Sequence, residues 1–231
     1  ETDQAAIRGK GTMETPAVEK FVSSLKDYYN TDTLTDFVVV CGDQEFKVHG
    51  VILSGHSKYF ATLFNGNWKE SADKRITISD FEPCIVEAML QFMYSFDYDT
   101  DSTGLVHDAE VYQIADKYDV PGLKAHAQKK FSASLSGRWN VFGFFVAIPV
   151  VYESTPPTDR GLRDLVIEAA QRHMGEVIKE DGFDDLIRTA PDFAAELIPA
   201  LYRKLPSVVT YKKGPVDVEV TDIGDRRQER S

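Results

Sequence analysis

The middle of the chain alternates between strand-like and helix-like spacing of its apolar residues. Residues 36–40 form a short, mainly apolar run with three β-branched valines, and residues 44–48 alternate polar and apolar side chains after a turn at Gly42-Asp43, which predicts a β-hairpin. Residues 75–78 alternate in the same way and predict a third strand. Apolar residues at helical spacing predict two helices after the hairpin and another after Pro83, which suits a first helical turn.

Helical patterns continue on both sides of this region. Apolar residues at i, i+3, i+4 and i+7 predict a short amphipathic helix near the start of a first domain, residues 16–136. Residues 137–206 predict three or four further helices. Residues 1–15 and 207–231 are polar or charged, so we expect a disordered leader and a disordered charged tail.

The composition is that of a folded acidic protein. The chain has 231 residues, of which 42% are hydrophobic, and a formal net charge of -11. Because an acidic surface repels phosphates, we expect no nucleic-acid partner. The longest apolar run, residues 141–152, is shorter than the roughly 20 residues that cross a bilayer, and no secretion signal is recognisable. We therefore expect no membrane partner and a location in the nucleus, the cytoplasm or both.

The sequence shows no recognisable catalytic or cofactor motif. The five histidines lie on separate predicted elements without metal-ligand spacing, and there is no nucleophile elbow or phosphate loop. Asp97, Asp99 and Asp101 alternate as at the start of a calcium loop, but Ser102 replaces the turn glycine and Asp108 the bidentate glutamate. A solvated acidic loop is the interpretation that we prefer. We expect no enzyme activity, no metal and no cofactor.

Several short segments follow one another in an order that is hard to obtain by chance. They are Asp36-Phe-Val-Val-Val40, Glu45-Phe-Lys-Val-His49, Ser57-Lys-Tyr-Phe60, Leu63-Phe64, Arg75-Ile-Thr-Ile78, Phe92-Met-Tyr94 and the helical stretch Ala109–Tyr118. Together they resemble a BTB/POZ domain over about residues 33–136. The resemblance predicts an α/β fold of the α+β kind, with a small β-sheet flanked by helices. The all-helical C-terminal region that follows is similar to the start of a BACK region.

In many BTB proteins the first helix packs against a partner subunit. The resemblance therefore implies a homodimer, with Val18, Phe21, Val22 and Leu25 as contacts and Asp36 at the same interface. A stripe of large apolar groups on a short helix needs a second surface to bury it. In the alternative interpretation, the helix covers its own subunit.

BTB proteins that recruit a cullin scaffold carry a hydrophobic-x-Glu motif in the loop before the third strand. Trp68-Lys69-Glu70 matches it position by position, although the family often has an aliphatic residue in place of tryptophan. An exposed apolar group can anchor in a partner pocket while the carboxylate pairs at its rim. The resemblance implies Tyr94 as a further cullin contact. In the alternative, Trp68 folds back on its own domain, Glu70 is a solvated charge and Tyr94 is a half-buried residue that ends a helix.

These features predict a protein-interaction module: a dimeric BTB scaffold or adaptor that recruits a cullin-based E3 ubiquitin ligase to an unknown client protein. The alternative is a BTB-containing transcriptional or chromatin regulator without cullin binding. That class usually has Lys or Arg after the histidine that matches His49, and this residue forms a charged pocket with the aspartate that matches Asp36. Here Gly50 stands in its place, and we expect Asp36 and Lys47 to be a partial substitute.

Overall fold

The chain divides into two compact units. The structure is a computed structural model that describes residues 16–66, 68–98, 104–137, 139–203, 209–211 and 218–220. The N-terminal unit lies within Glu1–Arg138 and the C-terminal unit within Trp139–Ser231. The predicted leader, residues 1–15, lies outside the described residues, as does most of the predicted tail.

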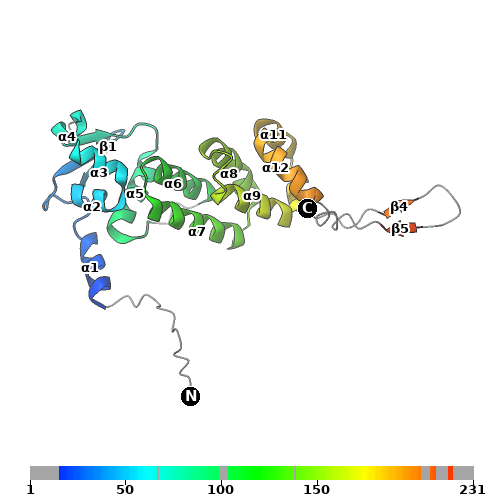
Figure 1. Cartoon of the computed structure of the whole chain (residues 1–231), viewed down its shortest axis with the longest axis horizontal. Helices are drawn as coiled ribbons and strands as arrows, with labels where there is room; N and C mark the ends of the chain where they lie inside the picture. The colour runs from blue at the N-terminus through cyan, green and yellow to red at the C-terminus, as the bar shows by residue number, and fades with distance from the viewer. Residues whose placement is uncertain are drawn as a thin grey trace, which may run out of the picture. The chain divides into compact units, whose positions relative to one another are not determined.

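A three-stranded sheet forms one side of the N-terminal unit (Figure 1). Its strands are β1 (Phe37–Cys41), β2 (Gln44–Val48) and β3 (Arg75–Thr77). The central strand β1 pairs antiparallel with β2, with Val39 opposite Phe46, and parallel with β3, with Val39 opposite Ile76. Alternate residues of β1 are buried, so one face of the sheet packs on the core. Gly42 in the hairpin turn has φ +56°, a conformation that favours glycine. The predicted hairpin and third strand are therefore confirmed.

Helices cover this sheet and complete the core of the N-terminal unit. They are α1 (Pro16–Lys26), α2 (Gly50–His56), α3 (Lys58–Asn65), α4 (Lys69–Asp73), α5 (Pro83–Ser95), α6 (Leu105–Lys117) and α7 (Pro121–Gly137). The Ser57 hydroxyl begins α3 by accepting a hydrogen bond from the Phe60 N–H at 3.0 Å. Most residues of α5 are buried, and α1, α2 and α6 pack against it. The short helix α4 was not predicted, because none of its five residues is buried and it has no apolar period.

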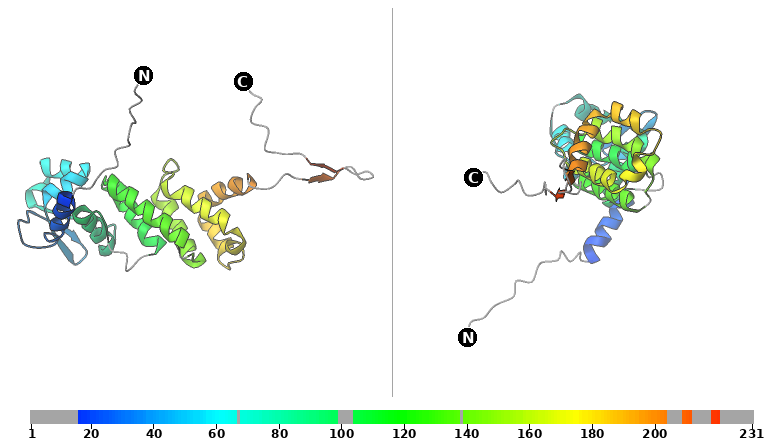
Figure 2. Two further views of the ribbon diagram at one scale, coloured as in Figure 1. Left: turned by 90° about the horizontal axis from the view of Figure 1, so that it is seen from below. Right: turned by 90° about the vertical axis from the view of Figure 1, so that its right-hand side faces the viewer.

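The C-terminal unit is helical, as predicted, but contains more helices than the three or four expected. The described residues form α8 (Val141–Ser154), α9 (Gly161–Arg172), α10 (Met174–Val177), α11 (Phe183–Thr189) and α12 (Pro191–Tyr202). The short helices α10 and α11 account for the difference, since they have too few turns for a clear apolar period. Helices α8, α9 and α12 pack on one another (Figure 2). None of the helices in the described part of the chain is long and apolar enough to span a membrane.

Two short strands lie in the segment predicted to be a disordered tail. β4 (Val209–Tyr211) pairs antiparallel with β5 (Val218–Val220). Each strand has a polar residue between two apolar ones, a strand pattern that was overlooked because the composition of the segment is polar and charged. The other residues from 204 onward lie outside the described residues.

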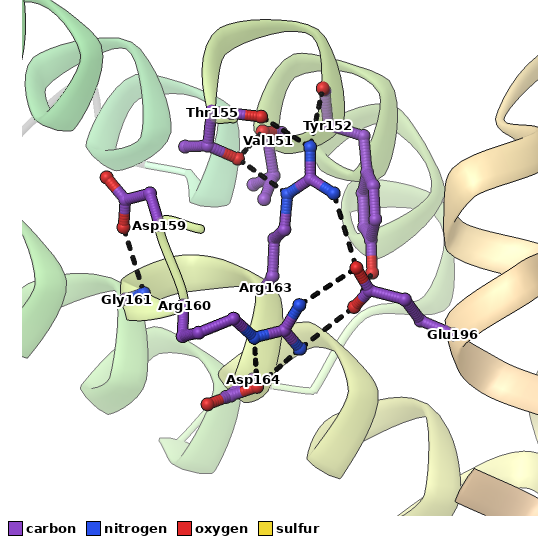
Figure 3. Close-up of polar contacts among 9 residues, drawn as sticks. All are labelled: Val151, Tyr152, Thr155, Asp159, Arg160, Gly161, Arg163, Asp164 and Glu196. Atoms are coloured by element: carbon purple, nitrogen blue, oxygen red, sulfur yellow. Dashed lines mark hydrogen bonds and ion pairs between the residues drawn. The ribbon is translucent and has the colours of Figure 1, made fainter. Parts of the chain in front are cut away.

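A buried arginine joins three helices of the C-terminal unit (Figure 3). Arg163 donates from Nε to the Thr155 hydroxyl at 3.0 Å, from Nη2 to the Tyr152 carbonyl oxygen at 3.2 Å, and from Nη1 to Glu196 at 3.2 Å. Arg160 donates to both carboxylate oxygens of Glu196 at 2.9 Å. This network therefore ties α8 and α9 to α12, and the charge of Arg163 is paired despite its burial.

Candidate functional site

Trp68 lies directly before α4 and is the N-cap residue of that helix. The residue is 56% exposed, yet its indole lies against the end of α3. A Cβ built at Gly66 would stand 2.2 Å from Nε1 and 2.3 Å from Cδ1 of Trp68. One side of the indole therefore rests on the main chain of its own loop, while more than half of the residue's surface is open to solvent.

Glu70 lies in the first turn of α4, where a carboxylate interacts favourably with the helix dipole. Its side chain is exposed. The Ala72 N–H donates to the Trp68 carbonyl oxygen at 3.1 Å, and the Ser71 hydroxyl donates to the Phe64 carbonyl oxygen at 3.4 Å. The structure thus brings Trp68 and Glu70 together at the start of a short helix that is attached to α3.

Tyr94 lies in the core of the N-terminal unit, with 1% of its surface exposed. Its hydroxyl accepts a hydrogen bond from the main-chain N–H of His49 at 2.9 Å and lies 2.7 Å from Nδ1 of the same residue. His49 Nε2 lies 2.8 Å from the Thr33 carbonyl oxygen, which can only accept, so we assign the ring proton to Nε2 and let the Tyr94 hydroxyl donate to Nδ1. Burial raises the pKa of Tyr94 to about 12, against the effect of the His49 N–H. The Tyr94 side chain is not at the surface, and its role as a cullin contact stays a prediction.

Helix α1 carries both half-buried and exposed apolar residues. It packs against α5, and Val22 and Leu25 are half-buried. Val18 is 52% exposed and Phe21 is 63% exposed. The helix therefore covers its own unit with part of the predicted stripe and leaves the remaining part in solvent. The homodimer contact through this helix stays a prediction.

Asp36 caps helix α2. Its Oδ1 accepts a hydrogen bond at 2.7 Å from the main-chain N–H of Gly50, where the helix begins. Lys47 forms an ion pair with Asp32, so the pair of Asp36 with Lys47 that we expected is not formed. The physical reason is that a helix N-terminus supplies an N–H group without a helical partner beside Asp36. The position of Asp36 at a dimer interface stays a prediction.

Two of the aspartates considered for a calcium loop, Asp99 and Asp101, lie outside the described residues. Asp97 is described, and its Oδ1 lies 2.9 Å from His126 Nε2 and 2.8 Å from Lys130 Nζ. Burial alone would raise the pKa of Asp97, but hydrogen bonds from Lys130 and His126 lower it to about 2. Within the described ranges, no group of three or more His, Cys, Asp or Glu side chains could hold a metal ion.

Asp108 is a buried carboxylate whose role was missed in the sequence. It accepts hydrogen bonds from the Tyr98 hydroxyl at 2.8 Å and the Ser134 hydroxyl at 3.3 Å. Burial raises the pKa of Asp108, although the bond from Tyr98 opposes this. The stripe of α6 that includes Val111 and Ala115 reaches position 108 when it is extended back by one turn, and this signal could have revealed the burial.

Comparisons with known proteins match the N-terminal unit to a known domain family. A family model described as "BTB/POZ domain" matches residues 25–135. A BTB/POZ domain-containing protein of Arabidopsis thaliana is 26% identical over 187 residues, which are 80% of this chain and 86% of that protein. BTB and MATH domain-containing protein 40 of Caenorhabditis elegans is 34% identical over 96 residues, which are 39% of this chain and 24% of that protein.

Solved structures of BTB domains are also similar to this chain. The BTB domain of zebrafish PATZ1 is 18% identical, with a TM-score of 0.42, and the similarity covers 51% of this chain and 93% of that domain. The BTB domain of human gigaxonin has the same identity and TM-score over 54% of this chain and 98% of that domain. The family match and the curated relatives lead to one conclusion: residues 25–135 of this chain form a BTB/POZ domain, which is a protein-interaction module.

Proposed function

We propose that this chain is a dimeric BTB adaptor that brings a client protein to a cullin-based E3 ubiquitin ligase. The observation that carries the proposal is the exposed indole of Trp68 on a supported loop, with Glu70 in the first turn of α4. These two residues have the chemistry and spacing of the hydrophobic-x-Glu motif in cullin-recruiting BTB proteins. The match of residues 25–135 to the BTB/POZ family supports the same assignment.

An exposed tryptophan on a fixed support is well suited to anchor a protein partner. Trp68 is 56% exposed, so a partner pocket can bury roughly 140 Å² of it, which contributes about 3 kcal/mol at about 25 cal/mol per Å². The indole already lies against Gly66, which reduces the entropy that it loses on binding. This free energy is that of a typical interface hot spot. Glu70 adds a carboxylate that can pair with a donor at the rim.

Dimerisation through α1 is the second part of the proposal. Val18 and Phe21 are large apolar residues that α1 leaves in solvent, and the same face of a second copy would bury them. A dimer presents two cullin-binding sites and two client-binding surfaces, which raises avidity for bivalent clients without any new contact. The helical C-terminal unit fits the BACK-like extension of such adaptors.

The geometry around Asp36 favours an adaptor over a transcriptional regulator. In the regulators that we considered, a basic side chain after the histidine forms a charged pocket with the aspartate. Here the Asp36 carboxylate is engaged by the N–H of Gly50, and Lys47 pairs with Asp32. A corepressor pocket of that kind would lack its cation.

Calorimetric titration of the full chain with the amino-terminal domain of a cullin tests the proposal. Trp68→Ala is expected to weaken binding at least about tenfold, because it removes the anchor. Phe142→Ala is the matched control, since Phe142 is a comparably exposed aromatic residue of the C-terminal unit, and it should leave the affinity unchanged. Absence of binding by the folded wild-type chain, or equal affinity of the Trp68→Ala variant, would contradict the proposal.

A further inference from the structure

Gly66 ends α3 in a backbone conformation that does not require glycine. Its φ is -92° and its ψ is 165°, which lies in the extended region open to any L-residue. Its N–H donates to the Leu63 carbonyl oxygen at 3.4 Å, and an alanine would keep this bond. The backbone dihedral angles of Gly66 therefore do not require glycine at this position.

The indole of Trp68 gives a reason for glycine at this position. A Cβ at Gly66 would stand 2.2 Å from Nε1 and 2.3 Å from Cδ1 of Trp68, well inside van der Waals contact, and 3.1 Å from the Thr62 carbonyl oxygen. A methyl group would displace the indole first, because a side chain rotates more easily than the backbone of α3 moves. The orientation of Trp68 therefore depends on the bare backbone of Gly66.

Both sides of this contact are held by the fold. α3 is buried through Phe60 and Leu63, and α4 is attached to α3 by the hydrogen bond from Ser71 to Phe64. Gly66 thus forms a surface held by the fold, and the indole rests on it in the absence of a partner. Such preorganisation improves affinity, because less rotamer freedom is lost on binding.

We propose that Gly66 is a positioning residue, which sets the orientation in which Trp68 is presented to its partner. The inference rests on the proposed function, in which Trp68 is the cullin anchor. It also gives a specificity rule: the bare backbone at position 66 is needed by an indole at position 68 and not by a shorter aliphatic side chain. In the Trp68→Leu background, Gly66→Ala is therefore expected to have no effect on binding.

The two indole N–H resonances of the full chain, observed by proton–nitrogen correlation, test the contact without a partner. The chain contains two tryptophans, and Trp139, whose Nε1 donates to Glu176 at 2.9 Å, is the internal reference. Gly66→Ala is expected to shift the Trp68 resonance and leave that of Trp139 in place, with Trp68→Phe used for assignment. An unshifted Trp68 resonance in a folded Gly66→Ala variant would overturn the inference.

Titration with the cullin amino-terminal domain then tests the consequence for binding. Gly66→Ala is expected to weaken binding about threefold to tenfold, the range set by the ordering of one side chain. In the Trp68→Leu background, the same change should alter the affinity by less than about twofold, which also shows that alanine is tolerated in the fold. Equal weakening in both backgrounds, or none in the wild type, would overturn the inference. If the wild-type chain binds no cullin domain, the proposed function fails, while the indole shift still decides whether Gly66 positions Trp68.

Discussion

The hydroxyl of Tyr94 is the atom whose removal has the most clearly defined effect on the N-terminal unit. In Tyr94→Phe the ring stays, but the main-chain N–H of His49 loses its acceptor and the Nδ1 atom of His49 loses its donor. Both residues are buried, so these two polar groups are largely removed from bulk water. The bond from His49 to the Thr33 carbonyl oxygen would be weakened in turn, because the ring is no longer held from its other side.

The expected loss of stability follows from the number of unpaired groups. A buried donor or acceptor without a partner costs about 1 to 3 kcal/mol. A cavity of about 320 Å³ beside Tyr94 and Tyr29 can admit water to relieve part of this cost, so we expect a loss of about 2 to 4 kcal/mol in total. Equilibrium urea unfolding followed by circular dichroism should show a midpoint lower by about 1 M or more.

Tyr28→Phe is the matched control for this change. The Tyr28 ring lies in a T-shaped arrangement with the same histidine, with ring centroids 6.0 Å apart, but the residue is exposed. We expect its free energy of unfolding to change by less than about 0.5 kcal/mol. A loss below about 1 kcal/mol in Tyr94→Phe, or a loss equal to that of the control, would refute the reasoning about the two buried groups.

Three further changes test other parts of the structure. The double substitution Val18→Ser and Phe21→Ser removes the exposed apolar residues of α1 and should give a monomer of 25.9 kDa in sedimentation. A dimer of unchanged mass would exclude α1 as the interface. Arg163→Met leaves two buried carbonyl oxygens without their donor, and calorimetry should show a free energy of unfolding lower by about 3 kcal/mol. The control Arg188→Met removes an exposed ion pair and should lower the free energy of unfolding by less than about 0.5 kcal/mol. The raised pKa of Asp108 means that its contribution to stability is lost as the pH rises through the folded pKa. Asparagine does not titrate, so in urea titrations the free energy of unfolding of Asp108→Asn relative to wild type should increase from about pH 4 to 7. A difference in unfolding free energy that stays constant over this range would contradict the raised pKa.

Local patterns in the sequence predicted the hairpin and the starts of the main helices correctly. Gly42 marks the turn with a positive φ, Ser57 caps α3, and Pro83 stands in the first turn of α5. These features depend on residues that are neighbours in the chain, so the amino-acid order contains the necessary information.

Pairings between distant residues could not be predicted in the same way. The parallel pairing of β3 with β1 depends on the packing of the helices between them. The pattern places Tyr94 at the end of a helix, but its burial depends on His49, 45 residues earlier in the chain. The contact of Trp68 with Gly66 depends on the angle between α3 and α4, which no periodicity encodes.

The burial of charged residues in the core was also not predicted from the sequence. Arg163 lies on the same stripe of α9 as Ile167 and Ala170, at i+4 and i+7. This spacing indicates burial, but a charged residue is rarely buried without partners, and the partners of Arg163 come from α8 and α12. Such networks become visible when the helices are packed together.

The mass of the complex in solution tests the central claim most directly. Light scattering of the full chain mixed with the amino-terminal domain of a cullin should give two chains with two cullin domains. Trp68→Ala should leave a dimer of twice 25.9 kDa without a cullin domain. Serine at both Val18 and Phe21 should give one chain with one cullin domain, because the anchor is intact. A folded wild-type chain that remains at 25.9 kDa, or a dimer that binds no cullin domain, would contradict a dimeric adaptor anchored by Trp68.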